Sequence, residues 1–189
     1  MDLLLGVFSA FGLSASAGLN AYIPLLVISL VGRYTNWITL SEPWNTLENG
    51  WVIAFLLLLS AIEFFADKVP AVNHANDLIQ TLVRPAAGAI AFAANADIIT
   101  DANVVFSLIL GLLVAGGVHA TKSVIVRPAV TATTGGAGNI PISILEDVVS
   151  TFLSILSVLI PVIVAVILIM VAAWVIWLLW RRANRLARS

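Results

Sequence analysis

AIEFFADKVP, residues 61–70, follows an apolar run and sets two carboxylates and an amine at its end. In a helix, Glu63 and Asp67 are four residues apart and therefore share one face. Ionisable groups in a membrane segment are costly, so they usually face a bundle interior or a watery cavity and mark a site. Glu63 is therefore the first candidate for a functional residue. The alternative is that Asp67 and Lys68 only mark the water interface.

The composition is that of a membrane protein. Of the 189 residues, 61% are hydrophobic and 10% are charged, and the mean hydropathy is +1.07. This composition is too apolar for a soluble domain of this size. We therefore predict an all-α, polytopic helical bundle that forms a single transmembrane domain over residues 1–189. The absence of cysteine excludes disulfides, thiolate metal sites and cysteine nucleophiles.

The basic residues are concentrated at the C-terminus. Four of the nine lie in the last nine positions, namely Arg181, Arg182, Arg185 and Arg188. Lysine and arginine are enriched on the cytoplasmic side of membrane proteins. We expect a multi-pass protein of the cell inner (cytoplasmic) membrane with both termini in the cytoplasm.

The apolar stretches predict about six crossings. Residues 3–32 would span roughly 45 Å as one helix, which is longer than the hydrocarbon core, so we expect a break or a strong tilt near Gly18. Residues 33–50 form a polar connection whose tryptophans suit the membrane interface. The remaining predicted crossings are residues 51–67, 78–96 and 104–121, and two within 141–180 that meet near 157–161.

Two further segments have an unusual polarity. Asn73, Asp77, Gln80 and Arg84 fall at i, i+4, i+7 and i+11, which places them on one helical face. That face is either the water-exposed side of an interfacial helix or the lining of a cavity. Residues 131–141 contain too much glycine and threonine for a regular helix; such backbone is tolerated at the surface, or at depth where it lines a cavity. We expect residues 135–139 to be non-helical and to lie near the protein interior.

An internal duplication relates residues 1–96 to residues 104–182. Three short matches recur in the same order: 18–21 with 117–120, 62–63 with 145–146, and 82–86 with 158–162. With three spans in each half, the second half starts from the opposite side, which is a 3+3 inverted repeat with broken or re-entrant segments. Such repeats are common among secondary transporters and hold the site at their interface. A rival alignment matches residues 83–86 with 126–129.

The repeat defines the candidate site. It pairs Asn20 with His119. It also pairs Glu63 with Glu146. We predict that Glu63 is the central functional residue, with Glu146 as its repeat partner and Asp67 in support. Carboxylates of this kind hold a cation or move a proton, while nearby basic groups would hold an anion. The full set of candidate residues is Asn20, Glu63, Asp67, Lys68, Arg84, His119, Lys122, Arg127, Asn139, Glu146 and Asp147.

The histidines do not favour a zinc site, and the sequence leaves metal binding open. His74 and His119 lack the paired spacing of a zinc site, and an interior histidine that donates to a carbonyl is the simpler interpretation of His119. We expect no cofactor and no nucleic-acid partner. The expected partners are the lipid bilayer, an ion or small polar solute, and further copies of the chain in a homo-oligomer.

Five stretches together resemble a known family: GLNAY (18–22), EFFADKVP (63–70), VRPAAGA (83–89), HATK (119–122) and LED (145–147). They are similar to signatures of an uncharacterised prokaryotic integral-membrane family, domain of unknown function 4126. The resemblance covers nearly the whole chain and implies no activity, so it supports only the choice of residues. The glycine-rich residues 134–139 depart from the more serine- and proline-rich loop of relatives.

Three functions remain open. The repeat, the broken first span and the intramembrane carboxylates favour a small transporter or permease, which needs no catalytic group. A membrane-embedded enzyme acting on a lipid or phosphorylated small molecule would use the backbone of residues 135–139 beside Arg127 and Lys122. The sequence has no P-loop, Gly-x-Ser-x-Gly or HExxH to support it. The third hypothesis is a structural membrane-assembly subunit.

Overall fold

The computed structural model describes residues 3–68, 70–96 and 104–186, and these ranges contain helices and no strand, which confirms the predicted all-α class. The helices in chain order are α1 (Leu3–Leu19), α2 (Tyr22–Tyr34), the 3-10 helix η1 (Trp44–Glu48), α3 (Gly50–Ala66), α4 (Pro70–Ala96), α5 (Val104–Thr121), the π-helix η2 (Lys122–Val126), α6 (Arg127–Thr134), α7 (Asn139–Leu159) and α8 (Pro161–Leu186).

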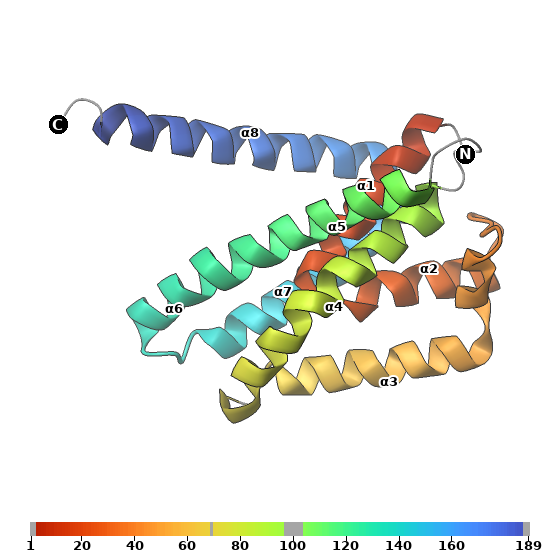
Figure 1. Cartoon of the computed structure of the whole chain (residues 1–189), viewed down its shortest axis with the longest axis horizontal. Helices are drawn as coiled ribbons and strands as arrows, with labels where there is room; N and C mark the ends of the chain where they lie inside the picture. Colours follow the sequence, from red (N-terminus) through yellow and green to blue (C-terminus); the bar gives the residue numbers. More distant parts are fainter. Residues whose placement is uncertain (1–2, 69, 97–103, 187–189) are drawn as a thin grey trace.

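The first two helices form a helical hairpin. Figure 1 shows α1 running from the N-terminal end towards the middle of the molecule, and α2 returning to that same end. The side-chain oxygen of Asn20 accepts the N–H groups of Tyr22 and Ile23 at 3.2 and 3.1 Å, and so satisfies groups that the start of a helix leaves without partners. We expected one broken crossing near Gly18; instead the chain reverses just after Leu19.

The α4 helix is continuous from Pro70 to Ala96. This corrects the prediction of a separate crossing that begins at residue 78. Its residues Asn76, Gln80 and Arg84 are all buried. They are spaced four apart, so they form one stripe that points into the protein and lets the helix continue. The side chains of Asn73 and Asp77 lie outside the described part of the chain.

The second half of the chain also departs from one expectation. From Val104 to Thr134 the chain is helical throughout, so the start of the threonine-rich run belongs to α6. Only residues 135–138 form a turn, where Gly135 and Gly136 adopt φ of 64° and 93°, a region that glycine enters without steric cost. Gly135 is exposed and not interior, as we had expected. The junction of α7 and α8 falls at Ile160, within the predicted region.

Helix α1 is the centre of the bundle and packs against α4, α5, α7 and α8. Its contact with α7 is built from serines: Ser16 Oγ lies 2.6 Å from Ser154 Oγ and donates to the Ser150 carbonyl at 2.8 Å. The contact between α4 and α5 depends on small residues, because a Cβ placed on Gly88 would overlap the Cβ of Ala115. Small side chains of this kind allow close helix packing.

The outward faces of the helices are apolar. Large exposed side chains include Trp51 on α3, Leu113 on α5, Phe152 on α7 and Trp174 on α8. Two helical stretches of the described residues, Val104–Thr134 and Asn139–Leu159, are long and apolar enough to cross a membrane.

Candidate functional site

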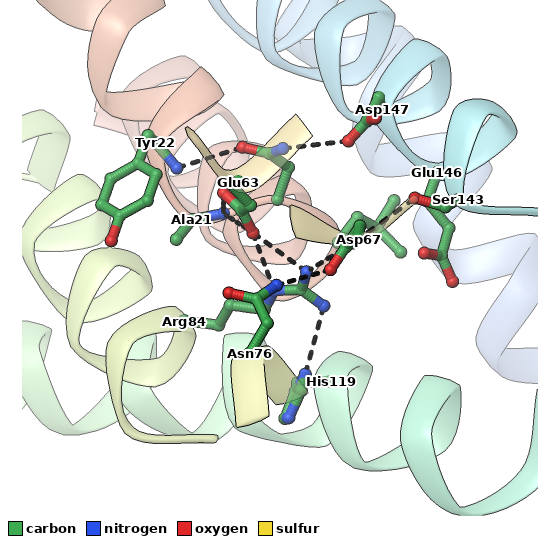
Figure 2. Close-up of polar contacts among 12 residues, drawn as sticks. Ala21, Tyr22, Glu63, Asp67, Asn76, Arg84, His119, Ser143, Glu146 and Asp147 are labelled. Carbon is green, nitrogen blue, oxygen red and sulfur yellow. Dashed lines mark hydrogen bonds and ion pairs between the residues drawn. The ribbon is translucent and has the colours of Figure 1, made fainter. Parts of the chain in front are cut away.

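Charged side chains from separate helices converge where α3 and α5 end and α7 begins, against the tip of the α1–α2 hairpin. Figure 2 shows several of them around Arg84 and Asp67. Each has an oppositely charged partner within 4.0 Å. We call this set the charged cluster, and among the described side chains it consists of Glu63, Asp67, Lys68, Arg84, Lys122, Arg127, Glu146 and Asp147.

The most buried pair of the cluster joins α3 to α4. The Nη2 and Nε atoms of Arg84 donate to Glu63 Oε1 at 2.9 and 3.2 Å, and both side chains are 0% exposed. The backbone N–H of Ala21 donates to the same carboxylate at 3.1 Å. A charge buried this deeply requires partners of this kind, because an unpaired charge in the interior is strongly destabilising.

Asp67 is the hub of the cluster. Its Oδ2 lies 3.1 Å from Arg127 Nη2, 3.4 Å from Arg84 Nη2 and 4.0 Å from Lys122 Nζ. Its other oxygen, Oδ1, accepts the amide of Asn76 at 2.6 Å. One carboxylate therefore holds α3, α4, η2 and α6 together.

Helix α7 supplies two further carboxylates that serve different partners. Glu146 Oε2 lies 2.6 Å from Lys122 Nζ and 3.4 Å from Arg127 Nη2. Asp147 accepts Lys68 Nζ at 2.9 Å and the Asn20 amide at 3.0 Å. The four acids and four bases of the charged cluster thus balance, and its formal charge is zero.

The tip of the α1–α2 hairpin adds the two ends of its helices to this cluster. The carbonyl of Leu19, at the C-terminal end of α1, accepts Lys122 Nζ at 3.1 Å. The N–H of Ala21, at the start of α2, donates to Glu63. A helix carries partial negative charge at its C-terminal end and partial positive charge at its N-terminal end, so both contacts are electrostatically favourable.

The structure brings ten of the eleven predicted residues together. His119 joins the edge of the cluster, with Nδ1 3.4 Å from Arg84 Nη1 and Nε2 3.3 Å from Thr81 Oγ1. Asn139 is the exception, because it bonds to Thr131 at the far end of α6. In the parts of the chain that the structure describes, no three His, Cys, Asp or Glu side chains are grouped so that they could hold a metal ion.

Sequence reasoning missed Asn76 and Ser143, which both bond to Asp67, the latter at 3.4 Å. The sequence spacing of each residue indicates that it lies on a polar helix face. Asn76 precedes Gln80 and Arg84 by four and eight residues. On α7, Glu146 is buried, and five other buried polar residues fall at alternating intervals of four and three: Ser143, Asp147, Ser150, Ser154 and Ser157. This heptad-like spacing predicts a polar helix face.

The turn at residues 135–138 does not approach the cluster. Arg127 begins α6 and points to Asp67, whereas the turn follows the last residue of that helix, about 12 Å away along its axis. The arrangement in which the backbone of this turn would bind phosphate beside Arg127 and Lys122 is therefore not formed.

A groove of about 660 Å³ borders the cluster on one side, and its lining includes Lys122 and Glu146. Most of its lining is aliphatic. Glu63 lies outside this lining and is 1% exposed. Glu63 and Glu146 are thus connected through ion pairs, and Glu146 lines the groove.

Comparison with known proteins identifies the family. No curated protein matches the chain, and no solved structure matches it. The model of a family described as a domain of unknown function (DUF4126) matches residues 7–181, which confirms the resemblance. The match covers nearly the whole chain, and the protein therefore belongs to this uncharacterised family.

Proposed function

We propose that this protein is a small transporter or permease of the cytoplasmic membrane for an ion or small polar solute. The observation that carries the proposal is the α1–α2 tip, where one helix end meets Lys122 and the other meets Glu63. In transporters with interrupted helices, such half-helix ends face the solute and its coupling ions. Here the chain's own ammonium and carboxylate occupy the corresponding positions.

The distribution of polarity supports a location in the bilayer. Buried positions include four carboxylates, three of the cluster's bases and many serines, while the outward faces of α3, α5, α7 and α8 carry large apolar side chains. Soluble monomers rarely expose apolar patches of more than a few hundred Å². Irregular backbone, such as the reversal at Asn20, is tolerated at membrane depth only where it is buried in protein or lines a cavity.

The repeat hypothesis is supported for part of the chain. In Figure 1, α3 and α7 run in opposite directions, and so do α4 and α8, as an inverted repeat requires. By contrast, α1 and α5 run the same way. The third sequence match is not equivalent in structure, because Pro85 lies inside α4 and Pro161 begins α8. We propose that the inversion relates α3–α4 to α7–α8 and that the first helices depart from it.

The hairpin changes the expected topology. If α1–α2 re-enters, then α3, α4, α5–α6, α7 and α8 give five crossings, and the termini lie on opposite sides. Lys68, Arg127 and the C-terminal arginines are then on one side, which the positive-inside rule assigns to the cytoplasm. We propose this arrangement in place of six crossings with both termini cytoplasmic.

Labelling in intact cells tests the topology. The chain has no native cysteine, so single-cysteine variants need no other change. We expect Thr46→Cys and an epitope tag placed before Met1 to be accessible from outside, and Asn184→Cys to be accessible only after permeabilisation. Both target positions are exposed. A tag that is protected until permeabilisation, with Thr46→Cys accessible, would restore the six-crossing topology.

The described arrangement is a closed one, because each charge in the cluster has a partner. A solute can enter only by exchanging with an ion pair, since an unpaired buried charge is costly. The Lys122–Glu146 pair borders the groove, so we propose that a solute exchanges with this pair. Asp67 can hold Lys122 and Arg127 while Glu146 is engaged elsewhere, so the exchange need not unfold the cluster.

Proteoliposomes loaded with ion-sensitive dyes test the function with protons, Na⁺, K⁺ and chloride as probes. We expect the wild-type protein to raise the flux of at least one of these ions above that of protein-free liposomes. Glu146→Gln should abolish this flux but leave a folded protein, because Lys122 and Arg127 both keep Asp67 as an ion-pair partner. Glu42→Gln, at an exposed position of the connection between α2 and α3, is the control. Equal flux in Glu146→Gln and the wild type, or no flux of any probe, would refute the proposal.

A further inference from the structure

The groove beside the charged cluster lies between α5, α7 and α8. Its volume of about 660 Å³ is that of a small-molecule site, for which roughly 300–1,000 Å³ is usual. Helix α8 packs on α1 and α7, and its Val171 and Val175 form one wall of the groove. Neighbouring residues of α8 such as Ile169 and Trp174 are exposed. The groove is thus flanked by the apolar surface that we assign to lipid.

The charged part of the groove lies towards one end of it, with apolar lining on both sides: Leu113 and Val114 on one, Val126 and Ile142 on the other. Lys122 and Glu146 form this charged part; they are 3% and 8% exposed, and their charged atoms are 2.6 Å apart. Leu113 lines the apolar part and precedes Lys122 by nine residues, a distance of about 13 Å along a helix. A ligand that fills such a groove has a polar head and an apolar chain.

The charge of the cluster selects among amphiphiles. Its four acids and four bases balance, so a ligand with a net charge would leave one buried charge without a partner, which is unfavourable. A zwitterionic head avoids this cost, since its cationic group can bind Glu146 while its anionic group binds Lys122. Arg127 and Asp67 stay paired with each other at 3.1 Å during this exchange.

We propose that this groove binds one acyl chain of a zwitterionic membrane lipid, whose head group exchanges with the Lys122–Glu146 ion pair. In the topology proposed above, this end of the groove lies towards the cytoplasm, so the lipid comes from the cytoplasmic leaflet. The site follows from the groove and the cluster and does not depend on transport. A bound head group would open one ion pair of the cluster and so link lipid binding to the α1–α2 tip.

Gly117 allows the groove to be filled without disturbing the fold. It lines the groove, and a Cβ placed on it meets nothing within 4 Å. Gly117→Leu should therefore project into the groove. Ala120→Leu is the matched control, because Ala120 lies on the same helix, is exposed and is not among the groove residues.

Native mass spectrometry of the detergent-purified chain tests the site with lysophosphatidylethanolamine as the zwitterionic probe and lysophosphatidylglycerol as the anionic one. We expect the wild type and Ala120→Leu to retain the zwitterionic probe about tenfold more tightly than Gly117→Leu does, a difference of one decade in Kd. Glu146→Gln, which removes the partner of the ammonium, should weaken retention of the zwitterionic probe more than that of the anionic probe.

Several results would overturn the inference. Equal retention by Gly117→Leu would place the lipid elsewhere on the surface. Tighter binding of the anionic probe would refute the exchange with a zwitterion. A lipid-free dimer that Gly117→Leu dissociates would make the groove a contact between copies of the chain. None of these results bears on ion flux in proteoliposomes, so the proposal of transport stands or falls separately.

Discussion

Arg84→Met is expected to destabilise the protein by about 3–5 kcal/mol, the usual cost of removing one partner of a buried ion pair. Arg84 and Glu63 are both 0% exposed, and among the described residues the other donor to the Glu63 carboxylate is the N–H of Ala21. Without the guanidinium, the Glu63 charge would be buried without compensation. Thermal unfolding in detergent, followed by the fraction of monodisperse protein, measures the loss.

The double variant Glu63→Gln/Arg84→Met separates charge from shape. Glutamine keeps an oxygen for the Ala21 N–H and removes the unpaired charge, so the double variant should be more stable than Arg84→Met alone. Arg33→Met is the control for losing an arginine, because Arg33 is exposed and donates to the Glu48 carbonyl; it should cost about 0.5 kcal/mol or less. If Arg84→Met unfolds like the wild type, the ion pair does not carry the fold.

Gly88→Leu is expected to prevent folding, at a cost above the roughly 1–3 kcal/mol typical of overpacking. A Cβ on Gly88 would overlap the Cβ of Ala115 and lie 3.1 Å from the Gly111 carbonyl, which is backbone and cannot turn away. It would also lie 3.0 Å from Ser14 Oγ, on the central helix α1. The close contact of α4 with α5 would have to open. The yield of monodisperse protein after extraction from membranes measures the effect.

Two glycine variants control for that result. Gly117→Leu introduces the same side chain on α5 where a Cβ has open space, so it should give a near-normal yield. Gly88→Ala should be intermediate, because it adds only the Cβ and not the rest of the side chain. Wild-type yield and melting temperature for Gly88→Leu would show that the α4–α5 contact tolerates separation.

The tertiary structure decided how the predicted elements join. A break near Gly18 was predicted from the sequence. The direction of the chain after the break depends on Glu63, which accepts the N–H of Ala21 from 42 residues away, and on Lys122, which donates to the Leu19 carbonyl from 103 residues away. A local sequence pattern carries no information on partners at that distance. In the same way, Asn76 faces Asp67 and not water only because α3 and α4 meet there.

The sequence by itself determined the helical class, the junction near residue 160 and all eight charged residues of the cluster. Helical class follows from hydropathy and periodicity, and a charge beside an apolar span must find a partner in the interior. Only the tertiary structure decided which partner each charge takes, because the cluster is satisfied by balancing four acids against four bases from separate helices. That balance is a property of the assembled bundle, and on it rests our proposal that the groove accepts, at Lys122 and Glu146, a neutral ligand that carries both charges.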